Sequence, residues 1–343
     1  MKISLFLFIF FKITIVTFGQ HINIVKQIDS LILTKSAKTF NGVILVSENG
    51  QTKYLKNFGY SDIEKKELLK LNDQFVIGSI SKQFTAVLVL RELDKGNLDL
   101  FKPIHKYLPE LKQSWADTIT IHHLLTHMHG ITELDKPTIF KVGSQYSYSQ
   151  IGYDLLSKIV ERTSKKSFAE LSQNLFTICG MANTFHPNTK KYKNLVKGYT
   201  ENESGQIAFE TETFKNYVAA GSFISTVNDL NIWNSLFYGR KLLKSKTMKM
   251  LETKQKGAIR NHPLFGLTEY GYGITIETKG NIIQFGQTGF APGFVSMNFY
   301  FPKTRTSLIV LENIAYDTDD LKKTFTYHTE ILKIVRNEIK HYR

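Results

Sequence analysis

The sequence predicts an α/β fold of the α+β type: one antiparallel sheet formed from both chain ends, flanked by helices and interrupted by a mostly helical insertion. Two observations support this fold class. Short apolar runs bounded by turn residues, typical of strands, occur before about residue 60 and again after about residue 265. Between them, apolar residues recur mostly at helical spacing. The sequence shows no internal repeat and no Pro-rich linker, so we expect residues 20–343 to form a single domain.

The first 19 residues have the layout of a secretory signal peptide. A basic start at Lys2 precedes an apolar run that Lys12 interrupts, and Gly19 provides a small-residue exit. Neither half of the interrupted run reaches the ~20 residues that a membrane-spanning helix needs. We therefore expect residues 1–19 to be cleaved, the protein to be exported to the periplasm or outside the cell, and no stable membrane insertion after cleavage.

Composition and charge narrow the class of protein. The chain has 343 residues, of which 42% are apolar and 22% are charged, as is typical of a folded domain. Its 44 Lys and Arg against 30 Asp and Glu give a net charge of +14. The lysines are scattered and form no basic block with interleaved aromatics, so no nucleic-acid partner is expected. The single cysteine, Cys179, excludes an intramolecular disulfide and a cysteine-based metal cluster.

In the first part of the predicted sheet region, about residues 20–98, local patterns define three elements. Apolar residues at helical spacing from 24 to 32 predict an amphipathic helix. Strand-like segments at 42–47 and 53–59 flank an Asn-Gly pair, which is a strong signal for a β-hairpin. A helix from about 79 to 93 is apolar nearly all round, which predicts that it is buried.

The rest of the chain divides into a mostly helical region, about residues 99–264, and the second part of the sheet region, about residues 265–343. The clearest amphipathic run of the helical region spans 151–160. An apolar stripe between 321 and 339 predicts a C-terminal helix. Strands are expected at 272–277, 282–287, 294–300 and 307–311.

The sharpest local feature with chemical meaning is the chain's only Ser-x-x-Lys spacing, Ser79 and Lys82. A helix that starts here places both side chains on one face. A serine hydroxyl becomes a nucleophile when a nearby base takes its proton, and a buried lysine with a lowered pKa can do so. The helix N-terminus adds unpaired N–H groups that favour a developing oxyanion.

Around these residues the sequence resembles the class C β-lactamase and D-alanyl-D-alanine carboxypeptidase-like serine hydrolases of the serine β-lactamase and penicillin-binding-protein superfamily. Residues 75–86, FVIGSISKQFTA, are similar to the active-site serine segment of that family. Further matches follow in the family's order at 121–131 (IHHLLTHMHGI), 146–156 (YSYSQIGYDLL), 219–233 (AAGSFISTVNDLNIW) and 286–294 (GQTGFAPGF). Ordered matches are far more specific than any one motif. The resemblance implies a β-lactamase/transpeptidase-like fold and a serine hydrolase without a cofactor.

Residue by residue, the resemblance implies a catalytic set. Ser79 would be acylated, Lys82 would be its partner in proton transfer, and Tyr148 of the second motif would be the second proton shuttle. The implied oxyanion hole consists of the backbone N–H groups of Ser79 and Phe290.

The implied substrate-binding positions depart from the family pattern at two places. Thr288 and Gly289 match the third motif, but Gln287 stands where the family has Lys or His. Gln150 stands where the second motif has Asn. Neutral Gln287 can hydrogen-bond a substrate carboxylate without the charge-assisted part of that bond. We therefore expect weak β-lactamase activity and better turnover of neutral esters, unless a Lys or Arg from elsewhere reaches the site.

Four histidines, His122, His123, His127 and His129, raise the question of a metal site, because His123 and His127 are one helical turn apart. A zinc-protease helix would need Glu at position 124, where the chain has Leu124. The resemblance accounts for His123 and His127 as scaffold residues, so no metal is expected.

The leading hypothesis is an exported serine hydrolase that acts through an acyl-enzyme on Ser79. Its substrates would be small esters, D-Ala-type peptides or β-lactams, with cell-wall material as a candidate partner. One alternative is a pseudoenzyme or sensor that binds cell-wall peptides without turnover, weakened by Gln150 and Gln287. Another is an envelope-associated adhesion protein that uses the positive net charge. The presence of Ser79, Lys82 and Tyr148 favours the hydrolase.

Overall fold

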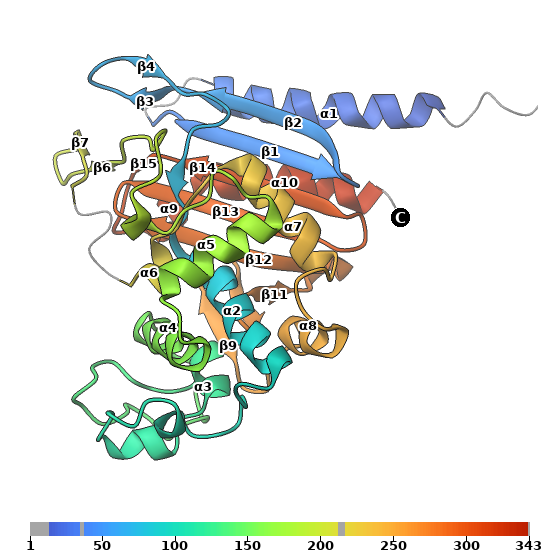
Figure 1. The fold of residues 1–343 in the computed structure, drawn as a ribbon. Coiled ribbons are helices and arrows are strands. Elements are labelled where there is room, and N and C mark those ends of the chain that lie inside the picture. Colours follow the sequence, from blue (N-terminus) through green and yellow to red (C-terminus); the bar gives the residue numbers. More distant parts are fainter. Residues whose placement is uncertain (1–13, 35–37, 212–216, 342–343) are drawn as a thin grey trace, which may run out of the picture.

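A large antiparallel sheet is the main element of the computed structural model, which describes residues 14–34, 38–211 and 217–341. Figure 1 shows the blue N-terminal strands lying beside the red C-terminal strands. In spatial order the strands are β2 (Gln51–Phe58), β1 (Gly42–Glu48), β14 (Thr306–Glu312), β13 (Phe294–Phe301), β12 (Gln284–Ala291), β11 (Thr275–Glu277), β10 (Gly266–Tyr270) and β9 (Ile259–His262). The predicted antiparallel sheet from both chain ends is confirmed.

The two chain ends meet where β1 pairs with β14. The register places Gly42 opposite Glu312 at one end of the ladder, and β1 continues into β2 through a two-residue turn. Asn49 (φ 49°) and Gly50 (φ 77°) both adopt the left-handed backbone that such a hairpin turn requires. The predicted hairpin is therefore confirmed at its turn as well as in its strands.

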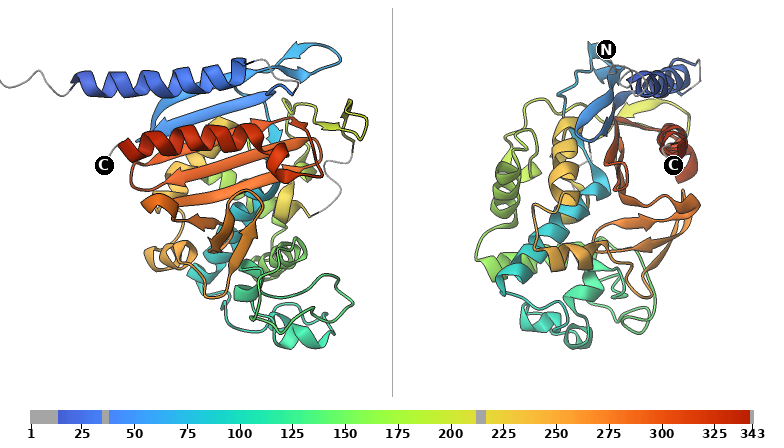
Figure 2. Two further views of the ribbon diagram at one scale, coloured as in Figure 1. Left: turned by 180° about the vertical axis from the view of Figure 1, so that it is seen from behind. Right: turned by 90° about the vertical axis from the view of Figure 1, so that its right-hand side faces the viewer.

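Helices cover both faces of the sheet. On one face α1 (Thr14–Leu33) packs beside α10 (Thr326–His341), as Figure 2 shows, and on the other face α7 (Val227–Tyr238) packs against β1, β13 and β14. Along β14, Val310 belongs to the core beneath α10, whereas its neighbour Ile309 belongs to the larger core on the other face. Because both faces are buried, the central strands are continuous apolar runs in the sequence.

Most of the remaining elements lie between β2 and β9, and the others lie between β11 and β12 or after β14. The helices are α2 (Ser81–Lys95), α3 (Ile121–Leu125), α4 (Ile151–Ser164), α5 (Phe168–Cys179), α6 (Val218–Gly221), α8 (Ser245–Glu252) and α9 (Leu321–Thr324). Single 3₁₀ turns are η1 (Gly78–Ile80), η2 (Ile104–Lys106), η3 (Ser114–Asp117), η4 (Pro187–Thr189) and η5 (Lys279–Asn281). Short strands pair as β3 (Tyr60–Asp62) with β4 (Glu67–Leu68), β5 (Phe75–Val76) with β8 (Ile224–Ser225), and β6 (Tyr199–Glu201) with both β7 (Ile207–Phe209) and β15 (Ile314–Ala315).

Several predicted elements differ from the structure in detail. The strand expected at 272–277 is β11, which begins at Thr275, and the one expected at 282–287 is β12, which begins at Gln284 and continues to Ala291. The helix predicted at 79–93 begins as the 3₁₀ turn η1 before continuing as α2, and the C-terminal helix is divided into α9 and α10 at Phe325. The segment 99–264, expected to be mostly helical, also contains the short strands β6, β7, β8 and β9. Of these, β9 is four residues long, and two of its side chains contact the candidate active site.

The predicted signal segment lies mostly outside the described residues. The structure describes the chain from Thr14, where α1 begins, so the helix predicted from residue 24 extends further toward the N-terminus. Residues 1–13, which hold most of the segment, are not described. Within the described ranges, no helix combines the length and hydrophobicity needed to cross a membrane.

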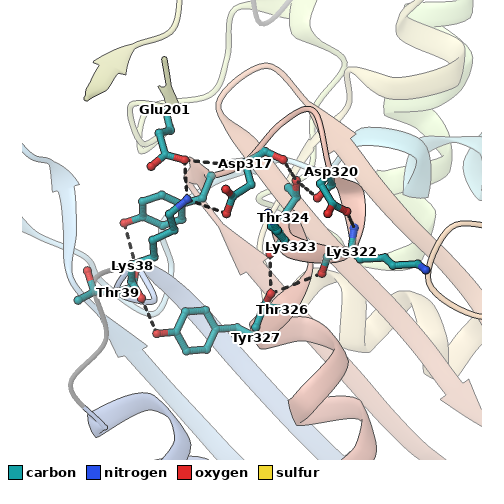
Figure 3. Close-up of polar contacts among 11 residues, drawn as sticks. Lys38, Thr39, Glu201, Asp317, Asp320, Lys322, Lys323, Thr324, Thr326 and Tyr327 are labelled. Atoms are coloured by element: carbon teal, nitrogen blue, oxygen red, sulfur yellow. Dashed lines mark hydrogen bonds and ion pairs between the residues drawn. The ribbon is translucent and has the colours of Figure 1, made fainter. Parts of the chain in front are cut away.

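A polar cluster joins three distant parts of the chain at one end of the sheet (Figure 3). Lys38 Nζ lies 2.8 Å from a carboxylate oxygen of Glu201 and 2.7 Å from one of Asp317. The hydroxyl of Tyr327, on α10, donates a hydrogen bond to the Lys38 carbonyl at 2.7 Å. The segment after α1 is thereby attached both to β6 and to the C-terminal helices.

Candidate active site

The candidate nucleophile lies on the turn that precedes a buried helix. Ser79 is the middle residue of η1, and its side chain is half-buried. Gly78 has φ +51°, and a Cβ atom there would lie 2.5 Å from the backbone nitrogen of Phe290. Glycine at position 78 therefore allows the turn to lie directly against β12.

The structure brings together Ser79, Lys82 and Tyr148, the three residues that the sequence analysis selects as catalytic. Lys82 Nζ donates a hydrogen bond to Ser79 Oγ at 3.0 Å, and the Tyr148 hydroxyl donates one to the same oxygen at 2.7 Å. Lys82 is three residues after Ser79 along one helical surface, whereas Tyr148 comes from the loop before α4. Both donors are within the range at which protons are exchanged with a nucleophile.

The Lys82 side chain is shielded from water. It is fully buried, and its Nζ also donates a hydrogen bond to the carbonyl of Ala220, on α6, at 2.8 Å. Burial lowers the pKa of Lys82, because removal from water disfavours the charged ammonium. A lysine whose pKa is lowered in this way can act as a base.

The Tyr148 side chain contacts the aromatic ring of His127 and the cationic groups of Arg260 and Lys82. The His127 ring lies 4.6 Å from the Tyr148 ring, and the Arg260 guanidinium carbon lies 4.4 Å from its centroid. Burial alone would raise the pKa of Tyr148, but the positive charges of Lys82 and Arg260 outweigh it, so the pKa is below its ordinary value. These contacts favour the phenolate, which can take a proton from Ser79.

The two backbone segments that carry the implied oxyanion hole are in contact. A Cβ atom at Gly289 would lie 2.2 Å from the carbonyl oxygen of Ile77, so β12 and the backbone before Ser79 are in direct contact. Phe290, the next residue of β12, is 38% exposed, and its nitrogen faces Gly78 as noted above. Both expected N–H donors, those of Ser79 and Phe290, thus belong to segments that contact each other.

Gln287 lies in this region but does not face the solvent. Its side chain is fully buried, and both ends of its amide have partners. Nε2 donates a hydrogen bond to the Tyr270 hydroxyl at 3.0 Å, and Oε1 accepts one from Arg260 Nη1 at 3.4 Å. The sequence predicts that Gln287 contacts the substrate directly. In the structure its amide oxygen instead contacts the Arg260 guanidinium.

Thr288 has a partner from the same strand as Arg260. His262 Nε2 and Thr288 Oγ1 are 3.3 Å apart, and His262 Nδ1 accepts a hydrogen bond from the Leu264 N–H at 3.1 Å. Because Nδ1 is an acceptor, the imidazole proton is on Nε2, which donates to Thr288. Burial lowers the pKa of His262 to about 2, so the ring is neutral.

Gln150 is not brought into the cluster. It is exposed at the start of α4, and within the described residues its side chain forms no hydrogen bond. Lys82 Nζ instead donates its hydrogen bonds to Ser79 Oγ and to the carbonyl of Ala220.

The four histidines serve separate structural contacts. His123 Nδ1 accepts the Thr120 N–H in the cap of α3, His129 Nδ1 accepts the Ile131 N–H, and His122 Nδ1 lies 2.8 Å from the Tyr272 hydroxyl. His127 packs behind Tyr148. In the part of the chain that the structure describes, no group of three or more His, Cys, Asp or Glu side chains is placed to hold a metal.

Arg260 and His262 are the site residues that sequence reasoning missed. They lie two apart on β9, so both side chains point to the same face of the strand. That spacing is the only local signal for them. The spacing indicates a shared face only in a strand, and the sequence predicts a mostly helical segment here.

Comparisons with known proteins identify the family and the fold of the chain. A family model described as Beta-lactamase matches residues 28–333. A penicillin-binding protein of Bacillus subtilis (strain 168) is 25% identical over 335 residues, which cover 86% of this chain and 73% of that protein. Teichoic acid D-alanine hydrolase of Staphylococcus aureus (strain MRSA252) is 26% identical over 272 residues, which cover 73% of this chain and 66% of that protein.

A solved structure shows the same fold over nearly its whole length. D-amino acid amidase from Ochrobactrum anthropi SV3, complexed with L-phenylalanine amide, has a TM-score of 0.79 at 20% identity and covers 92% of this chain and 99% of that chain. The β-lactamase/transpeptidase-like fold and the serine hydrolase class expected from the sequence are confirmed, and the chain belongs to the Beta-lactamase family.

Proposed function

We propose that this protein is an exported serine hydrolase that forms an acyl-enzyme on Ser79, with Lys82 and Tyr148 as its proton-transfer partners. The observation that carries the proposal is that Ser79 Oγ accepts hydrogen bonds from Tyr148 at 2.7 Å and from Lys82 at 3.0 Å. A hydroxyl within reach of two groups with lowered pKa values is what nucleophilic acyl transfer needs.

The proposed reaction has two steps. In acylation, Ser79 Oγ forms a bond to the substrate carbonyl carbon while its proton passes to Tyr148 or Lys82. The N–H groups of Ser79 and Phe290 stabilise the oxyanion, and the leaving group departs with the transferred proton. In deacylation, water attacks the acyl carbon, one of its protons returns to Ser79 Oγ, and the free acid leaves.

The substrate class that we propose is esters and amides of D-alanine or related D-amino acids, with small neutral esters and β-lactams as further substrates to be compared. Support comes from the names of similar proteins, one of which refers to teichoic acid D-alanine and another to D-amino acid amides. Such acyl groups occur in cell-wall material, which an exported enzyme would meet.

Covalent labelling tests the nucleophile. Intact-mass measurement after incubation with a fluorophosphonate should show one adduct on the wild-type protein and none on Ser79→Ala. Ser147→Ala is a matched control, because Ser147 lies next to Tyr148 and its side chain forms no hydrogen bond within the described residues. Labelling of Ser79→Ala at the wild-type level would contradict the proposal.

Turnover separates the hydrolase from the non-turnover alternative. Wild type should hydrolyse p-nitrophenyl acetate or D-alanine p-nitroanilide, and Ser79→Ala should lose several orders of magnitude in rate, as other serine hydrolases do. A stable adduct without any turnover would instead support a sensor or pseudoenzyme.

Export is tested on the full chain. Expression in a bacterial host followed by fractionation and N-terminal sequencing should give a mature protein that begins near Gln20, outside the cytoplasm. Protein that keeps Met1 and stays in the cytoplasmic fraction would contradict this part of the proposal.

A further inference from the structure

We propose that Arg260, on β9, supplies the positive charge that the third motif lacks at Gln287, and that Arg260 and the Thr288 hydroxyl together bind a carboxylate on the leaving group of the substrate. The inference rests on the proposed function and specifies which substrates that site prefers. It also replaces the expectation, drawn from Gln287 alone, of weak β-lactamase activity and better turnover of neutral esters.

The shape of the sheet explains how a residue of β9 reaches β12. In strand order β9 is separated from β12 by β11 and β10. However, β11 is only three residues long and pairs with β12 only at residues 284–286. Residues 287–288 of β12 therefore have no strand partner in β11. The side chains of Arg260 and His262 contact the side chains of Gln287 and Thr288 there.

Gln287 orients Arg260 and leaves its charge available. Arginine can only donate hydrogen bonds, so the Gln287 atom that faces it is the amide oxygen, and the amide nitrogen is directed to Tyr270. A guanidinium has five N–H donors. Within the described residues Arg260 forms no ion pair with a carboxylate, and its side chain is half-buried beside the Tyr148 ring.

Thr288 adds a second, oriented donor. Since His262 Nε2 donates to Thr288 Oγ1, the threonine hydroxyl proton is not used in that contact. Among the described residues the Arg260 guanidinium has no carboxylate partner, and Thr288, with its free hydroxyl donor, directly follows the Gln287 that Arg260 contacts. This combination favours a carboxylate, because a charge-assisted hydrogen bond is about twice as strong as a neutral one.

The test compares two substrates that differ only in charge: an aryl ester of N-acetyl-D-alanine with a carboxylate at the meta position of its leaving group, and the same ester with a carboxamide there. Arg260 also contacts Tyr148, but a change in Tyr148 slows both substrates alike. The ratio of the two kcat/KM values therefore isolates recognition of the carboxylate. Wild type should prefer the carboxylate, and Arg260→Gln should lower the ratio roughly tenfold.

Three further variants complete the experiment. Arg260→Lys should keep part of the preference. Gln287→Lys in the Arg260→Gln background should restore it, because the charge then returns to the third motif. Lys256→Gln, which removes one exposed cation from the loop before β9, should leave the ratio unchanged and controls for net charge.

The outcomes distinguish this inference from the proposed function. If the wild-type protein is not labelled by the fluorophosphonate, the proposed function is overturned and the inference with it. Normal labelling of wild type, together with a ratio near one or a ratio that Arg260→Gln does not change, would overturn the inference alone. A ratio lowered as much by Lys256→Gln as by Arg260→Gln would also overturn it, since the effect would then be one of net charge.

Discussion

At the scale of single residues, Lys82 and Tyr148 have lowered pKa values for different reasons. The pKa of Lys82 is low because the side chain is fully buried. For Tyr148 burial acts in the opposite direction, and the cations Lys82 and Arg260 outweigh it. The protonation of one group therefore depends on that of the other, so the two residues behave as one proton-transfer unit around Ser79.

Such a unit predicts non-additive losses. Lys82→Ala and Tyr148→Phe should each slow acylation by a neutral ester by two or more orders of magnitude, of the size seen for general acid–base catalysis. The double variant should lose far less than the product of the two factors. Pre-steady-state acylation rates measure this, with circular dichroism to verify that each variant is folded. Fully multiplicative losses would show that the residues act independently.

The pH profile gives a second prediction at this scale. The groups near Tyr148 that carry charge or titrate are Lys82, His127, Tyr146, Tyr153, Arg260 and Tyr270. Activity needs an unprotonated base, so kcat/KM should rise with pH through the pKa of this unit. Arg260 lowers the pKa of Tyr148, so Arg260→Gln should raise it and move the rising limb to higher pH.

Profiles for a neutral ester, recorded on wild type and on Arg260→Gln, measure this displacement. Arg260→Lys keeps a cation at the same position, so its rising limb should lie closer to that of wild type. A rising limb of Arg260→Gln at the wild-type position, or at lower pH, would show that Arg260 does not act on Tyr148.

At the scale of elements, the site depends on how closely η1 approaches β12. Two glycines make the approach possible, Gly78 on the turn and Gly289 on the strand, because a Cβ atom at either position would lie within 2.5 Å of backbone atoms of the other segment. Real Cβ atoms do not come so close to backbone, so the two segments would have to separate. The oxyanion donors are on these segments, which makes the separation a functional as well as a structural change.

Gly78→Ala should therefore destabilise the protein and abolish most acylation. Gly96→Ala is the matched control, since Gly96 also has positive φ (+82°) at the end of α2 but has open space around its Cβ position. The control should lose about 1 kcal/mol of unfolding free energy to backbone strain and keep the wild-type acylation rate. Urea denaturation and fluorophosphonate labelling measure the two effects. Equal acylation rates in the two variants would contradict the proposed role of the close approach.

At the scale of the whole molecule, buried hydrogen bonds connect the N-terminal segment around β1 to the C-terminal segment after β14. Asn313, directly after β14, is fully buried. Its amide nitrogen donates to the carbonyls of Tyr60 at 3.1 Å and Lys197 at 2.8 Å, and its amide oxygen accepts from Asn41 at 2.6 Å. One side chain therefore joins the segment before β1, the insertion and the C-terminal strand.

Asn313→Ala should cost about 2–3 kcal/mol of unfolding free energy, because it leaves several buried polar groups without partners. Lys38→Met removes the two ion pairs of the cluster in Figure 3, which links similar parts of the chain but is about one third exposed. Solvent screening limits its cost to less than about 1 kcal/mol, and 1 M salt should reduce it further. Urea denaturation of both variants compares the two; a larger loss for Lys38→Met would contradict this ranking.

The sequence determined the features that depend on short-range geometry. The hairpin at Asn49-Gly50 follows from backbone preferences, and the Ser79–Lys82 pair follows from helical spacing. Tyr148 is distant in the chain and was identified through the order of motifs, and the structure places it next to Ser79.

Only the tertiary structure decided where the second cation of the site comes from. Arg260, on β9, contacts Tyr148 and Gln287 at a point where β12 has no strand partner in β11. No local pattern encodes this contact, since it depends on the lengths and the pairing of strands that are distant from one another in the sequence. In the sequence, Gln287 replaces the basic residue of the third motif and so removes its charge. In the structure, the Gln287 amide oxygen accepts a hydrogen bond from Arg260, a cation that belongs to β9.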